Sequence, residues 1–245
     1  VYDDVINILF EEKAELISKF ICEKIYKFFV SPNPDNEIVS ELAAYFVDNN
    51  FELEPLFKKL FKSEHFFNKN SSNVIIKSPI DFMLFIEKEL NFEKPDNFTA
   101  NLTNYLRART TDMGQEILNP IDVAGWQGNH DWISTGTLPM RWEYGDYLLN
   151  RYWAKNKNQF SLLLKKMIGT ENDNPESIVK IVNSYMFCDY EIQDYELNDA
   201  VAIFIGDVPI NYFNGGGWSV DDDTTPKQFY DLLRFFITLP EYQLK

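Results

Sequence analysis

Apolar residues recur at helical spacing through most of this chain, and this periodicity constrains the fold more than any other feature. The clearest case is residues 14–30, where apolar side chains three and four positions apart predict a helix with one wide apolar face. On the opposite face Glu15 precedes Lys19 by four residues, a spacing typical of a solvated helix surface. The apolar stripe consists of Leu16, Ile17, Phe20, Ile21, Ile25, Phe28 and Phe29.

Residues that favour helix starts open the later apolar stretches. Ser78-Pro79, Asn174-Pro175 and Thr225-Pro226 each place a capping residue before a proline, which suits the first turn of a helix. Gly114 ends the stretch at 98–113. No segment shows convincing strand alternation, so we predict an all-α protein, a compact bundle of nine or ten helices. The predicted helices span about 14–30, 38–47, 54–61, 79–90, 98–113, 137–153, 160–168, 175–186, 195–205 and 226–239.

Two stretches, 115–136 and 206–224, lack this periodicity and are rich in Gly, Asn, Asp and Trp. Loops of this length inside a compact domain are uncommon and are often either functional or disordered. Their aromatic residues favour ordered loops packed onto the helices. These aromatic residues are Trp126, Trp132, Tyr212, Phe213 and Trp218.

Length and composition limit the classes of protein to consider. The 245 residues have ample volume for one helical domain, 1–245, and the polar stretch 154–158 is a candidate boundary between lobes 1–153 and 159–245. The chain begins at Val1 rather than at Met, so we expect it to be a piece of a longer protein with any targeting signal upstream. A net charge of −15 disfavours nucleic-acid binding. No apolar run reaches the roughly 18–20 residues of a membrane span.

Histidine is scarce, which limits the catalytic sites that the sequence can build. His65 lies at the polar end of a predicted helix, where a surface or capping role is ordinary. His130 lies beside Asp131 in the first loop, where a carboxylate can orient an imidazole as a base. No G-x-S-x-G elbow accompanies it, and the two histidines do not show zinc-ligand spacing. A histidine in a loop turn is therefore the favoured interpretation.

Asp221, Asp222 and Asp223 follow a glycine run, 215–217, and offer oxygen ligands for Ca²⁺. They do not match the EF-hand pattern, because Pro226 occupies the turn position and Leu232 the twelfth. A solvated loop before a helix is the simpler interpretation, since acids are favourable there. The glycine run is followed by no Lys-Ser/Thr pair, which disfavours phosphate binding. We therefore predict no cofactor.

The two cysteines, Cys22 and Cys188, exclude a disulfide-rich scaffold. Both lie in apolar helical contexts, which favours buried thiols over one long-range disulfide.

The order of motifs resembles the C-terminal half of the bacterial family called domain of unknown function 1800. Lys24–Val30, Lys77-Ser78-Pro79 and the closing Leu239–Gln243 follow the family pattern. Between them, Gly114–Pro120 leads into Val123–Trp126, Gly128 and Trp132-Ile133. The departures are small: Met113 replaces Leu, Asn119 precedes a single proline, and Asn129 replaces a second glycine.

The resemblance implies a larger protein, exported by a bacterium and therefore extracytoplasmic, with its N-terminal half outside this chain. It also implies a partner of the alkaline-phosphatase-like or sulfatase-like class encoded nearby. The family provides no catalytic residue to carry over. We therefore expect a non-catalytic module that binds or assembles with a partner protein or an extracellular polymer such as a glycan.

The segment Gly114–Arg141 is the predicted place of function. One interpretation makes it a plug of the helical bundle, with Arg141 satisfying main-chain carbonyls. The other makes it one wall of a binding cleft, or the site of a hydrolytic or polymer-modifying enzyme. The candidate ligand-binding residues are Gln115, Asn119, Trp126, His130, Trp132 and Arg141.

Overall fold

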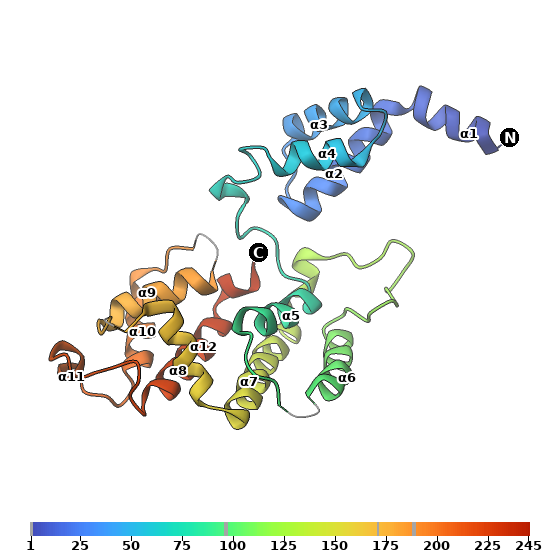
Figure 1. Ribbon diagram of the computed structural model, residues 1–245. Coiled ribbons are helices and arrows are strands. Elements are labelled where there is room, and N and C mark those ends of the chain that lie inside the picture. The colour runs from blue at the N-terminus through green and yellow to red at the C-terminus, as the bar shows by residue number, and fades with distance from the viewer. Residues whose placement is uncertain (1, 96–97, 171, 188–189) are drawn as a thin grey trace. The chain divides into compact units, whose positions relative to one another are not determined.

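The computed structural model describes residues 2–95, 98–170, 172–187 and 190–245, and its chain divides into two compact units, 1–75 and 76–245 (Figure 1). In the described residues the secondary structure is helical, apart from an isolated antiparallel bridge between Ile76 and Leu244. The all-α prediction is confirmed. The expected lobe boundary at 154–158 lies within the second unit, and the expectation of one domain from 1 to 245 stays a prediction.

The first unit is a small helical assembly in which α2 packs on α3 and α3 packs on α4. The Asp35 carboxylate accepts hydrogen bonds from the N–H groups of Glu37 and Ile38, which caps the start of α3. Cys22, Tyr26 and Phe46 belong to its buried core, whereas Cys188 lies outside the described residues. Its elements are α1 (Tyr2–Asn7), a π-helical turn (Ile8–Glu12), α2 (Ala14–Phe29), α3 (Asn36–Asp48), α4 (Leu53–Phe61) and a 3-10 turn (Lys69–Ser71).

The face of α2 that is buried differs from the centre of the predicted apolar stripe. Ser18, Cys22 and Tyr26 are buried, whereas Leu16 and Phe20 are exposed. A helix packed mainly against one partner buries a strip narrower than the stripe that its sequence provides. The periodicity therefore predicts the helix correctly. Which face of the helix is buried depends on how it packs against the neighbouring helices.

The second unit is built around α12, which packs against α7, α8 and α10. Nine of its residues are buried, among them Phe229, Leu233 and Phe236. The elements of this unit are α5 (Pro79–Leu90), α6 (Phe98–Asp112), a 3-10 turn (Asn129–Trp132), α7 (Thr137–Lys155), α8 (Asn158–Ile168), α9 (Pro175–Met186), α10 (Asp194–Ile205), α11 (Ile210–Asn214), α12 (Thr225–Thr238) and a 3-10 turn (Pro240–Gln243).

Local signals explain where the helices of this unit begin. The Ser78 hydroxyl accepts from the Asp81 N–H, and the Asn174 side chain accepts from the Ser177 N–H, each with proline in the first turn. Both caps are as predicted. The third predicted cap, Thr225, is wrong, because Thr225 is the first residue of α12 and the N-cap position is Thr224. The sequence did not predict α1 or the five-residue α11, since neither is long enough to show a period. None of the helices in the described part of the chain combines the length and apolarity needed to cross a bilayer.

Candidate functional site

Two of the predicted site residues meet at the segment before α5. The side-chain oxygen of Gln115 accepts a hydrogen bond of 2.9 Å from the Ile80 N–H, in the first turn of that helix. Arg141, on α7, donates from Nη2 to the carbonyl oxygen of Lys77 at 2.9 Å. Both side chains are buried. Their donors and acceptors therefore satisfy main-chain groups where the chain enters α5.

The turn at Gly114 places Gln115 for this role. Gly114 has a φ of +87°, a conformation that glycine adopts without strain, and it lets the Gln115 N–H bond back to the Thr110 carbonyl at 2.6 Å. The side chain of Gln115 then turns toward Ile80 rather than toward solvent. Gln115 therefore links the end of α6 to the first turn of α5 through two hydrogen bonds.

A buried lysine completes the cluster. The Lys77 ammonium donates to the Tyr242 carbonyl at 2.7 Å and lies over two rings, 3.9 Å from the centroid of Phe85 and 4.3 Å from that of Tyr242. Its main-chain N–H donates to the Gln243 carbonyl at 2.8 Å. Arg141 Nη1 donates to the Gln243 side chain at 3.5 Å, and its guanidinium lies over the Phe82 ring. We call Lys77, Arg141, Tyr242 and Gln243 the buried cation cluster.

Burial dominates the electrostatics of this cluster. Burial, together with the smaller effect of the nearby Arg141, lowers the pKa of Lys77 to about 7. Burial also lowers the pKa of Arg141 to about 10, against a small opposite effect of Asp81. Burial raises the pKa of the Tyr242 hydroxyl well above its ordinary value. The cluster thus links distant parts of the sequence at a cost in free energy, because Arg141 Nε and the Tyr242 hydroxyl are buried without a hydrogen-bond partner among the described residues.

The far end of the first loop is anchored as well. The Thr137 hydroxyl donates to the Trp132 carbonyl at 3.0 Å and accepts from the Ser134 N–H, which fixes the start of α7. Trp132 is buried, and Gly128, with a φ of +80°, lets the backbone pass close to its indole. The Asn129 side chain accepts from the Ile76 N–H at 3.5 Å. Both ends of the loop therefore rest on the second unit.

The middle of this loop has a different character. Figure 1 shows the connection between α6 and α7 extending away from the helices of its unit, and residues 116–124 are exposed throughout. Leu118 is 92 % exposed, Ile121 84 %, and Val123 fully. Leu118 has a φ of +65°, a strained value for a residue with a branched side chain. We call residues 116–124 the aliphatic tip. The aromatic part of the loop packs onto the helices at Trp132, as its composition predicts, whereas the aliphatic tip stays exposed.

The six candidate residues therefore fall into two groups. Gln115, Trp132 and Arg141 are buried parts of the fold, and Trp126 is half-buried. Asn119 and His130 lie exposed on the loop, with the Asn119 amide donating to Glu116 at 2.8 Å. The sequence missed the aliphatic tip, although Ile117, Leu118, Ile121 and Val123 within seven residues provided a signal for it.

The sequence comparison agrees with the motif order. A family model described as "Protein of unknown function (DUF1800)" matches residues 1–244. This chain belongs to the DUF1800 family. No curated protein and no solved structure matches it.

The second long loop of this DUF1800 chain is held by its aromatic residues. Trp218 is buried, stacks on Phe213 with centroids 5.4 Å apart, and donates from its indole N–H to Gln228 on α12 at 3.0 Å. The Asp221 carboxylate pairs with Lys165, and Asp222 accepts from the Ser219 N–H. The described residues contain no group of three or more His, Cys, Asp or Glu side chains placed to hold a metal ion.

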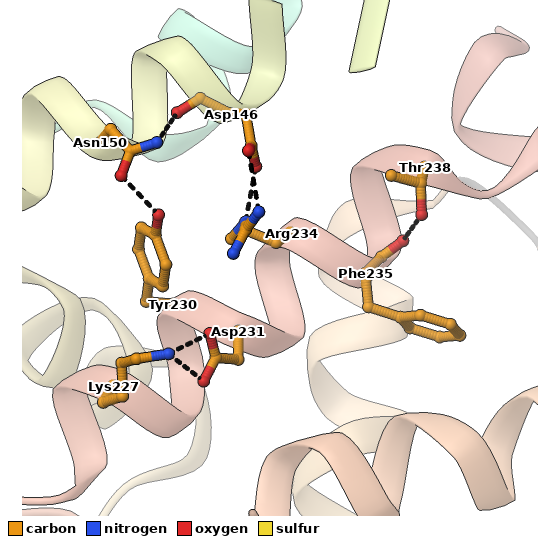
Figure 2. A network of polar contacts seen from close by, with 8 residues as sticks. All are labelled: Asp146, Asn150, Lys227, Tyr230, Asp231, Arg234, Phe235 and Thr238. Carbon is orange, nitrogen blue, oxygen red and sulfur yellow. Dashed lines mark hydrogen bonds and ion pairs between the residues drawn. The ribbon is translucent and has the colours of Figure 1, made fainter. Parts of the chain in front are cut away.

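A shallow groove of about 480 Å³ lies beside α7 and α12 of the DUF1800 fold. Figure 2 shows the Asp146 carboxylate paired with Arg234 across the two helices, and Asn150 joined to the Tyr230 hydroxyl. The same view shows Asp231 paired with Lys227. The Asp146 carboxylate raises the pKa of Arg234. Both carboxylates of the groove are therefore already paired with cations. The pair between Asp146 and Arg234 links α7 to α12. Its lining residues are Asp146, Ile203, Asp231, Arg234, Phe235 and Thr238.

Proposed function

We propose that this chain is a non-catalytic recognition module of an exported bacterial protein, and that the aliphatic tip contacts a partner protein. The observation that supports this most is the exposure of Leu118 and Ile121 on a loop with two buried anchors, Gln115 and Trp132. Exposed branched side chains cost free energy in water, which burial in an interface would recover. The strained backbone at Leu118 is also typical of functional sites.

The chemistry of the tip favours a protein over a glycan. Sugar rings are bound by stacking on exposed aromatic faces, but Trp132 is buried and Trp126 is half-buried. Aliphatic side chains suit the apolar centre of a protein interface. The partner we propose is the alkaline-phosphatase-like or sulfatase-like protein that the family resemblance implies is encoded nearby.

The enzymatic alternative gains less support from the residues. Gln115 and Arg141, two of its proposed members, satisfy main-chain groups around Lys77 and Ile80. His130 lies exposed in a short 3-10 turn. A general base works best where a nucleophile and an orienting group are held beside it in a shielded pocket.

The test is a binding measurement between the purified full-length protein and its purified genomic neighbour. Replacing Leu118, Ile121 and Val123 together by serine is expected to weaken binding at least about tenfold, as for loss of an apolar anchor. Leu162→Ser is the matched control, because Leu162 is 57 % exposed on α8, outside the loop. Equal binding by the triple variant and the wild type would rule out the tip as the contact.

A further inference from the structure

Helix α2 of the first unit presents an exposed line of side chains at steps of four residues. Leu16, Phe20, Lys24 and Phe28 follow one another along this line, and all four are exposed. Phe20 is 59 % exposed, and the Lys24 ammonium lies 4.6 Å from the centroid of its ring. Residues at this spacing share one side of a helix. Helix α2 therefore carries an apolar ridge with a cation in its middle.

Phenylalanine rings continue this ridge across α4. The ring of Phe29 lies 5.9 Å from that of Phe57 and 5.2 Å from that of Phe61, measured between centroids. Phe61 contacts Phe66 at 5.1 Å, and Phe66 contacts Phe67 at 5.3 Å. Phe67, at the end of this series, is 72 % exposed. We call the whole set the phenylalanine surface: Phe20, Phe28, Phe29, Phe57, Phe61, Phe66 and Phe67.

The charge around the phenylalanine surface opposes that of the chain as a whole. Residues 14–29 and 53–69, which carry the surface, contain seven lysines and four glutamates, a net charge of +3. The complete chain has a net charge of −15. Helix α3 of the same unit carries only acidic charges, at Glu37, Glu41 and Asp48. The lysines are thus concentrated on the two segments that carry the phenylalanines. Among these, Phe20, Phe28, Phe29 and Phe67 are exposed, and Phe57, Phe61 and Phe66 are half-buried.

We propose that the phenylalanine surface binds the anionic headgroup layer of a lipid membrane. Phenylalanine rings enter the boundary between headgroups and acyl chains, and lysines attract anionic phosphates, a combination typical of helices that lie on membranes. The residue types favour lipid over protein. Contacts that dominate protein interfaces are enriched in Trp, Tyr and Arg, yet residues 1–75 contain no Trp and no Arg. Lysine is a flexible point charge that suits a fluid surface without fixed acceptors.

The test measures sedimentation of the full-length protein with vesicles. One set is phosphatidylcholine, and the other includes about a third phosphatidylglycerol, which makes the surface anionic. The wild type is expected to bind the anionic vesicles at least about tenfold more tightly, and added salt is expected to weaken that binding. The double variant Phe20→Ser, Phe67→Ser is expected to lose at least about tenfold in affinity. Leu162→Ser, on α8, is the matched control and is expected to bind like the wild type.

A second pair of changes tests the charge and keeps every phenylalanine. Lys24→Glu with Lys62→Glu changes two exposed side chains, and it is expected to weaken binding to anionic vesicles while leaving the fold intact. The proposal fails if the wild type does not bind the anionic vesicles, or binds the anionic and the phosphatidylcholine vesicles equally. It also fails if either double variant binds like the wild type. Self-association or capture of an acidic protein through these residues, without vesicle binding, would assign the surface to a protein partner instead.

Discussion

The guanidinium of Arg141 donates a 2.9 Å hydrogen bond to the carbonyl oxygen of Lys77, so the two buried cations of the cluster are joined through the main chain. The ion pairs found among the described residues include neither side chain. Loss of Arg141 would therefore leave the Lys77 carbonyl unsatisfied and disturb the entry to α5. The variant Arg141→Ala is therefore expected to lower the free energy of unfolding, whatever its effect on an activity.

The buried Lys77 makes stability depend on pH in a predictable direction. Its pKa is about 7 in the folded chain, against an ordinary value of 10.5. Between these values the unfolded chain binds more protons, so the free energy of unfolding rises with pH. The largest slope expected is about 1.4 kcal/mol per pH unit. Below pH 7 lysine is charged in both states, and the slope from this group disappears.

Denaturant unfolding of wild type and Lys77→Met between pH 6 and about 9 measures this slope. The difference between the two proteins isolates Lys77 from other titrating groups. Lys88→Met, at an exposed position on α5, is the control and is expected to keep the wild-type slope. Parallel pH profiles for wild type and Lys77→Met would contradict the assignment. All five tryptophans lie in residues 76–245, so their fluorescence reports on the unit that contains the cluster.

Gly145 lies where α7 meets α12, and a Cβ atom added there would come 2.5 Å from Cγ2 of Ile237. Gly145→Ala is therefore expected to lower the free energy of unfolding by about 1–3 kcal/mol, measured by denaturation. Gly136→Ala is the matched control, because its added Cβ would meet only the Ser134 hydroxyl at an ordinary 3.7 Å. Equal stabilities for the two variants would show that α12 can shift away from α7.

The buried indole of Trp218 depends on a single acceptor, Gln228. Gln228→Leu leaves that N–H without a partner and is expected to cost about 1–3 kcal/mol of stability. Adding Trp218→Phe removes the N–H, so its further cost in the Gln228→Leu background is expected to be smaller than in the wild type. A double-mutant cycle of unfolding free energies measures this coupling. Simple additivity would mean that the hydrogen bond contributes nothing.

The thiol of Cys22 is fully buried in the first unit, and burial raises its pKa to about 11. In a Cys188→Ser variant, Cys22 is expected to react with a disulfide reagent at pH 8 at least about a hundredfold more slowly than in denaturant. The reaction time course, followed by absorbance, reports the opening of residues 1–75. A rate like that of the unfolded chain would mean that the packing around Cys22 is loose.

Sequence periodicity predicted the helices because each long helix repeats its apolar contacts several times. The start of α5 at Ser78-Pro79 and the end of α6 near Gly114 were predictable from local chemistry alone. Helix α11, with five residues, has too few repeats to be recognised. The exposure of Leu16 and Phe20 could not be predicted, since it depends on how much of α2 its neighbours cover.

The candidate site was harder to predict than the fold. Arg141 was considered as a residue that satisfies carbonyls, and its bond to Lys77 agrees with that interpretation. Aromatic content predicted that Trp132 and Trp218 would pack, and both are buried. The aliphatic tip was missed because Leu118 and Ile121 look like core residues in a linear sequence. Whether apolar residues in a loop are buried depends on contacts with residues distant in sequence.

The bridge between Ile76 and Leu244, with the Lys77 N–H bonded to the Gln243 carbonyl, brings the entrance and the exit of residues 76–245 to one point. A domain whose two ends lie close together can be connected to another protein at a single place on its surface. We therefore expect residues 76–245 to tolerate insertion into a surface turn of an unrelated host protein. We also expect this unit to tolerate circular permutation, in which a short peptide joins residue 76 to residue 245. The aliphatic tip is the exposed loop in which we would place the new ends.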